Sequence, residues 1–135
     1  MKKTIIFIAL ILTFFSCKKN RLNHYQNNIT EFLIKNHERP NAKLLLDTVS
    51  MFNWDEIIIA GPYTDLKKIS NYNFNNFPNT IKSFDNFVLF GFINKKKGVK
   101  YFEIDRYLIP DNLFSKKNMD YKIYKKKESV FLISK

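Results

Sequence analysis

The sequence predicts an α+β domain in which an N-terminal amphipathic helix packs against an antiparallel sheet of about five or six strands. Apolar residues recur at helical spacing before residue 40, and short β-branched and aromatic runs separated by turn residues follow. At 135 residues and 45% apolar content, the chain is long enough to build one core. We therefore predict a single α+β domain over residues 24–135.

The helix is predicted to end before Pro40, because the residue before a proline disfavours the helical backbone. Its apolar face comprises Leu22, Tyr25, Ile29, Phe32 and Leu33. His24 and His37 lie near opposite ends of this helix, so they are not expected to converge on one metal ion.

The middle of the chain predicts two strands and a long loop. Residues 43–52 and 54–60 form the strands, and the continuous isoleucine run of the second indicates burial on both faces. Thr64 is expected to cap a short helix after the Gly-Pro break. Residues 70–79 are expected to form a loop that two phenylalanines pin to the core.

Two hairpins are predicted in the last third of the chain. The first joins strands 87–93 and 99–108, with Gly98 supplying a positive φ in the turn. The second joins residues 121–124 and 130–133 around a lysine-rich loop. Core candidates on the first hairpin are Phe92 and Phe102.

The first seventeen residues have the organisation of a secretory signal. Lys2 and Lys3 precede the uncharged apolar run 5–15. About 20 apolar residues are needed to span a bilayer, so this run is too short for that role but suits the apolar region of a signal peptide. Ser16 and Cys17, the chain's only cysteine, follow it.

The Ser-Cys pair resembles the lipobox of bacterial lipoproteins, in which the cysteine receives a diacylglycerol and the signal is cut before it. Phe14 and Phe15 stand where that family prefers leucine and a smaller residue. The resemblance implies a signal peptide at 1–16 and a lipidated tether at 17–23, with acyl chains such as palmitate on Cys17. It implies a cell-envelope protein that is anchored to a membrane by lipid and faces the periplasm. The alternative is that Cys17 is an ordinary small apolar residue.

The net charge of +11 comes almost entirely from lysine, since the chain has only three arginines. Specific nucleic-acid recognition depends on the bidentate arginine fork, so we predict no nucleic-acid partner. Abundant Lys, Asn, Ile and Phe are typical of an AT-rich genome. The lysine runs 95–97, 116–117 and 125–127 are interpreted as solvated turns, with contact to anionic lipid headgroups as the alternative.

Residues 52–64 (FNWDEIIIAGPYT) resemble a pattern of small, uncharacterised bacterial envelope lipoproteins, in which a Trp-Asp pair opens an apolar strand that ends in Pro-Tyr-Thr. The resemblance carries no catalytic assignment. Two interpretations of the stretch stay open. In the first, Trp54 anchors the strand start and Asp55 satisfies nearby backbone N–H groups. In the second, Trp54, Asp55, Tyr63 and Asp65 form a binding corner for a small ligand or peptide.

No hydrolase, zinc-protease or nucleotide-binding motif is present in the sequence. We therefore predict no catalytic residues, no metal and no cofactor. Glu103 and Asp105 share one side of a strand, which is expected to face solvent. The predicted function is a non-enzymatic binding or packing module, whose partners are the membrane and, as a further candidate, an envelope protein. The alternatives are an immunity-type inhibitor of a toxin or lysozyme, or a small enzyme with a site assembled from scattered residues.

Overall fold

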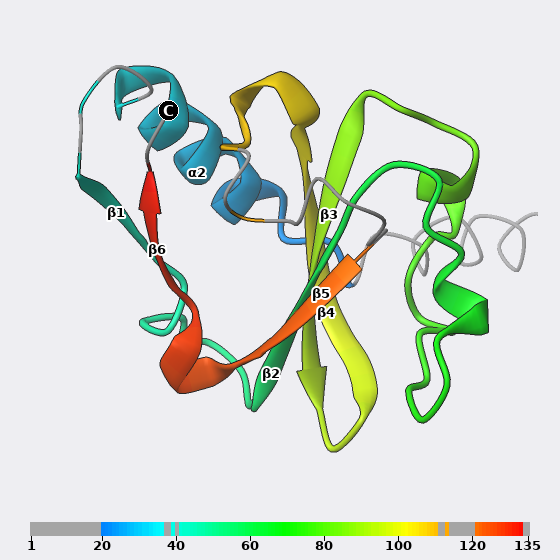
Figure 1. Ribbon diagram of the computed structural model, residues 1–135. Coiled ribbons are helices and arrows are strands. Elements are labelled where there is room, and N and C mark those ends of the chain that lie inside the picture. Colours follow the sequence, from blue (N-terminus) through cyan, green and yellow to red (C-terminus); the bar gives the residue numbers. More distant parts are fainter. Residues whose placement is uncertain (1–19, 37–38, 40, 111–112, 114–120, 134–135) are drawn as a thin grey trace, which may run out of the picture.

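The computed structural model describes residues 20–36, 39, 41–110, 113 and 121–133 (Figure 1). Within these residues it contains one α-helix and six strands, which confirms the α+β class. The elements are α2 (Asn23–Asn36), β1 (Ala42–Leu45), β2 (Glu56–Ala60), β3 (Phe87–Asn94), β4 (Lys97–Asp105), β5 (Tyr121–Lys125) and β6 (Val130–Ile133). The short 3-10 turns are η2 (Leu66–Lys68), η3 (Thr80–Lys82), η4 (Arg106–Leu108) and η6 (Lys126–Glu128). His37, the predicted signal peptide 1–16, Cys17 and Lys116–Lys117 lie outside the described residues.

The strands form two antiparallel sheets instead of one, with the order β4-β3-β2-β5 in the first and β1-β6 in the second. The predicted hairpin of β5 with β6 is therefore wrong, because β5 pairs with β2 and β6 pairs with β1. The turn η6 separates the two strands. The Lys126 N–H donates to the Asp55 carbonyl at 2.8 Å, and the Leu46 N–H donates to the Ser129 carbonyl at 3.0 Å. These bonds hold the start of η6 to one sheet and its end to the other.

Both faces of the four-stranded sheet are buried, as the isoleucine run predicts. Ile57 and Ile59 point into a core shared with α2 and the β1–β6 ribbon, while Ile58 points into a second core on the opposite face. All three are 0% exposed. Figure 1 shows α2 and the ribbon on one side of the sheet and the connection between β2 and β3 on the other.

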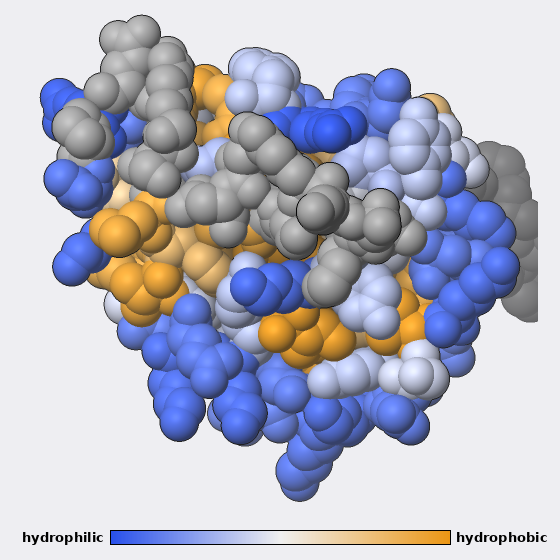
Figure 2. Space-filling model, viewed as in Figure 1, coloured by the Kyte–Doolittle hydropathy of each residue, from blue (hydrophilic) through white to orange (hydrophobic). Residues whose placement is uncertain are grey.

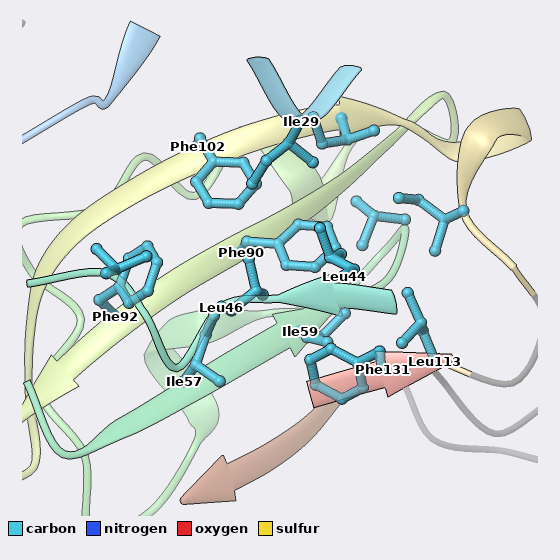
Figure 3. Packing of buried hydrophobic residues seen from close by; sticks show 14 of the residues in the cluster. Ile29, Leu44, Leu46, Ile57, Ile59, Phe90, Phe92, Phe102, Leu113 and Phe131 are labelled. Carbon is cyan, nitrogen blue, oxygen red and sulfur yellow. The ribbon is translucent and has the colours of Figure 1, made fainter. Parts of the chain in front are cut away.

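The first core is rich in aromatic rings and contains both predicted phenylalanines (Figure 3). Phe92 and Phe102 are 0% exposed, and their ring centroids lie 6.0 Å apart. The residue directly opposite Phe102 is Phe90, whose ring stacks on it at 5.0 Å. Close packing of rings from neighbouring strands holds this face of the sheet together.

The second core confirms that Phe74 and Phe77 pin the long loop, since both are buried. Gly98, however, has no positive φ, and Lys95 and Lys96 take that conformation instead, with φ of 48° and 66°. They are the central residues of a two-residue turn between β3 and β4. Gly98 lies under Phe77, where a Cβ atom would stand 2.8 Å from the ring carbon Cζ. Close approach of this ring, rather than turn geometry, is the physical reason for glycine at this position.

Three predicted boundaries also differ. Thr64 is not a helix cap, because its hydroxyl donates to the Gly61 carbonyl at 2.7 Å, and Asp65 caps η2 by accepting from the Lys67 N–H at 3.2 Å. The strand expected over 43–52 ends at Leu45, and the strand expected to reach residue 108 gives way to η4 after residue 105. These segments are turns closed by local hydrogen bonds, including Val49 N–H to the Leu46 carbonyl.

The fold extends further toward the N-terminus than the predicted tether boundary at residue 23. The Leu22 N–H donates to the Tyr101 carbonyl at 2.8 Å, and the Tyr101 N–H donates to the Asn20 carbonyl at 2.9 Å. Arg21 forms a parallel bridge with Tyr101, and its guanidinium lies 3.3 Å from the Glu103 carboxylate. Residues 20–22 therefore line the outer edge of β4, and Glu103 is paired instead of facing open solvent.

Candidate functional site

A groove of about 550 Å³ opens at the end of the four-stranded sheet where β2 begins. Its lining consists of one indole, two carboxylates and five lysines. These are Trp54, Asp55, Glu56, Lys95, Lys96, Lys125, Lys126 and Lys127. In Figure 2 the lower end of the molecule, where Figure 1 places the β3–β4 turn and η6, is covered by hydrophilic side chains. We call the groove lined by these eight residues the Trp54 groove.

The position of β2 in the sheet brings the two lysine runs together. Glu56 at the start of β2 pairs with Ile93 of β3 on one side and with Lys125 of β5 on the other. The turns that follow Ile93 and Lys125 therefore flank the same point. Asp55 holds both turns at the start of β2. Its Oδ2 atom accepts from the Lys95 N–H at 3.2 Å, and its carbonyl accepts from the Lys126 N–H at 2.8 Å.

Trp54 forms the apolar wall of the groove and is 5% exposed. Its Nε1–H donates to the Val49 carbonyl at 2.7 Å, and its ring meets Phe92 edge-on at a centroid distance of 4.9 Å. The expected anchoring of the strand start by Trp54 is confirmed. The Lys126 ammonium lies 4.7 Å from the centroid of the indole, which places a cation over the ring face.

Lys96 is the one lysine of the groove that forms an ion pair with a described carboxylate. Its Nζ donates to Tyr72 Oη at 2.8 Å and to Glu56 Oε2 at 3.0 Å. Both contacts raise the pKa of Lys96, and the contact with the Tyr72 hydroxyl has the larger effect. Lys95, Lys125 and Lys127 are exposed and have no such pair within the described part of the chain. The groove therefore carries an excess of positive charge.

The structure does not bring the four residues of the predicted binding corner together. Trp54 and Asp55 line the groove, whereas Tyr63 and Asp65 lie beyond the opposite end of β2. Five strand residues span about 16 Å, so the pairs are too far apart to share one small ligand. Tyr63 is 61% exposed.

Asp65 belongs to a structural network that holds the loop between β2 and β3. Its carboxylate lies 2.9 Å from the Lys82 ammonium and accepts from the Asn79 amide at 3.0 Å. These hydrogen bonds lower the pKa of Asp65 from 3.8 to about 2, and the bond from Lys82 has the largest effect. The carboxylate is thus fully engaged with its own chain.

Sequence reasoning missed Glu56 and the lysines as members of one site. The lysine runs 95–97 and 125–127 were visible as clusters, but their meeting point depends on the pairing of β3 and β5 with β2. A paired register of this kind has no signal in one sequence.

No group of three or more His, Cys, Asp or Glu side chains suited to a metal ion occurs in the described part of the chain. None of its helices is both long and apolar enough to cross a bilayer. Comparisons with protein-family models, curated proteins and solved structures find no match for this chain.

Proposed function

We propose that this protein is a lipid-anchored component of the bacterial cell envelope, whose folded domain is a non-enzymatic binding module facing the periplasm. The basic and apolar signal-like segment and the Ser16-Cys17 pair support the anchor. A cysteine thiol placed directly after such a segment can be acylated, and two or more acyl chains hold a protein stably at a membrane.

The attachment of residues 20–22 to β4 is the observation that carries this proposal. Asn20 is bonded to Tyr101 only three residues after Cys17. Three residues reach at most about 11 Å, so acyl chains on Cys17 would hold the edge of the sheet close to the lipid headgroups. Such a short connection suits a domain that works at the membrane surface.

Metabolic labelling with a palmitate analogue tests the anchor in the full chain. We expect the wild type to incorporate the label and to sediment with membranes, and Cys17→Ser to lose both properties. Ser16→Ala is the matched control, because it keeps a small residue at the cleavage position and should still be labelled. An unlabelled wild type that stays in the membrane with its leader intact would overturn the proposal.

A further inference from the structure

We propose that the Trp54 groove binds the phosphate-bearing headgroup of an anionic phospholipid. This inference rests on the proposed function in one respect, since the lipid anchor is what would hold the groove beside a membrane. It goes beyond that function by naming the ligand and the side chains that contact it.

The charge of the groove calls for an anion. Of its two carboxylates, Glu56 is paired with Lys96, and Asp55 accepts a backbone N–H of the β3–β4 turn. Lys95 of the β3–β4 turn, Lys125 at the end of β5 and Lys127 of η6 line the groove and are exposed. Lysines that line one groove from two sides bring several positive charges within reach of one phosphate.

The apolar part of the groove favours a lipid over a free anion. Trp54 forms one wall, and the methylene stems of the lysines cover further apolar surface. Tryptophan and lysine together are typical of surfaces that sit at the membrane–water boundary. A phospholipid has a phosphate for the lysine rim and, next to its glycerol, the first methylene groups of its acyl chains for the apolar wall.

The groove also lies within reach of the bilayer to which Cys17 would attach the domain. Asn20 is fixed at Tyr101, which is four residues along β4 from Lys97 at the edge of the β3–β4 turn. Four strand residues cover about 13 Å, which is comparable to the reach of the segment between Cys17 and Asn20. The tether, the β3–β4 turn and η6 can therefore contact one membrane surface at the same time.

Trp54 is the only tryptophan of the chain, so tryptophan fluorescence reports on the groove that it lines. We would reconstitute the full chain into phosphatidylcholine vesicles containing increasing fractions of phosphatidylglycerol and record Trp54 emission. The Lys126 ammonium over the indole will move toward a bound phosphate, so we expect a change in emission that saturates with phosphatidylglycerol. Inorganic phosphate added to pure phosphatidylcholine vesicles should give little of this change.

Two charge-matched double variants locate the response. Lys125→Glu/Lys127→Glu should require at least about tenfold more phosphatidylglycerol for half of the change. Lys67→Glu/Lys68→Glu alters the net charge equally on exposed positions of η2, away from the groove, and should respond like the wild type. Far-UV circular dichroism and urea midpoints matching the wild type would establish that both variants fold.

Three other outcomes would contradict the groove inference, and a fourth bears only on the anchor. Equal loss in the two double variants would mean that diffuse surface charge, not the groove, attracts the lipid. A full response to inorganic phosphate would identify a free-anion site instead. A wild type that carries palmitate but shows no dependence on phosphatidylglycerol would overturn the groove inference while leaving the anchor intact, whereas absence of the label would overturn the anchor alone.

Discussion

Replacing Trp54 with alanine should be the most damaging single change at the groove. Substitution of a buried tryptophan by alanine costs about 3–5 kcal/mol of unfolding free energy. Trp54 is 5% exposed and contacts Phe92 edge-on, a geometry worth about 0.5–1.5 kcal/mol beyond burial. Alanine also removes the donor to the Val49 carbonyl, and an unsatisfied buried acceptor costs about 1–3 kcal/mol.

These contributions overlap, so we expect a loss of about 4 kcal/mol for Trp54→Ala. The vacated space opens onto the groove, where water can enter, and this keeps the loss within the usual range. Trp54→Phe retains an aromatic ring for Phe92 but lacks the N–H, so it should cost only about 1–2 kcal/mol. The order of the two variants is therefore part of the prediction.

Urea unfolding of the full chain in detergent, followed by far-UV circular dichroism, measures both losses without using tryptophan fluorescence. Tyr63→Phe is the control, because Tyr63 is 61% exposed and should change the unfolding free energy by less than about 0.5 kcal/mol. If Trp54→Ala stays within about 1 kcal/mol of the wild type, the anchoring role assigned to the indole is incorrect.

Three further predictions concern β3, the β3–β4 turn and the segment between β2 and β3. Gly91→Ala should lower the unfolding free energy by about 1–3 kcal/mol in urea titrations, because its Cβ would collide with the Phe77 ring, and Phe77→Leu in the same chain should restore part of the loss. Lys95→Gly should raise the thermal midpoint, since Lys95 has a φ of 48° and relief of this strain is worth about 0.5–1 kcal/mol. Asp65→Asn should lower the urea midpoint at neutral pH. The lowered pKa of Asp65 means that the stabilisation from its carboxylate is complete above pH 3.8 and disappears as the pH falls through about 2. The urea midpoints of wild type and variant should therefore converge in acid. A constant difference between the midpoints down to pH 2 would exclude the Lys82 pairing as the source of the stabilisation.

Much of the local structure followed from residue patterns alone. The apolar spacing of Tyr25, Ile29 and Leu33 located α2, and apolar runs located β2 and β3. The isoleucine run also indicated that β2 is buried on both faces. These patterns are reliable because side-chain burial repeats along each element with the period of its backbone. Anchoring of the strand start was one of two interpretations of Trp54 that the sequence left open, and the buried ring with its N–H bonded to the Val49 carbonyl confirms it.

Turn details were less predictable, because a glycine has more than one possible use. Gly98 follows three lysines, so it looked like the residue that would take a positive φ. In the structure Lys95 and Lys96 take it, and Gly98 makes room for a phenylalanine 21 residues earlier in the chain. Contact with a distant ring leaves no mark in the local sequence.

The sequence by itself determined the α+β class and the positions of most strands, and it is the sole basis for predicting a leader that ends at the only cysteine. Only the tertiary structure decided that β5 and β6 belong to different sheets and that two lysine runs, about 30 residues apart, meet at Trp54. The physical reason is that burial patterns are local properties of a chain. Strand partners are chosen by the packing of the whole core, and the groove exists only where β3 and β5 flank the start of β2.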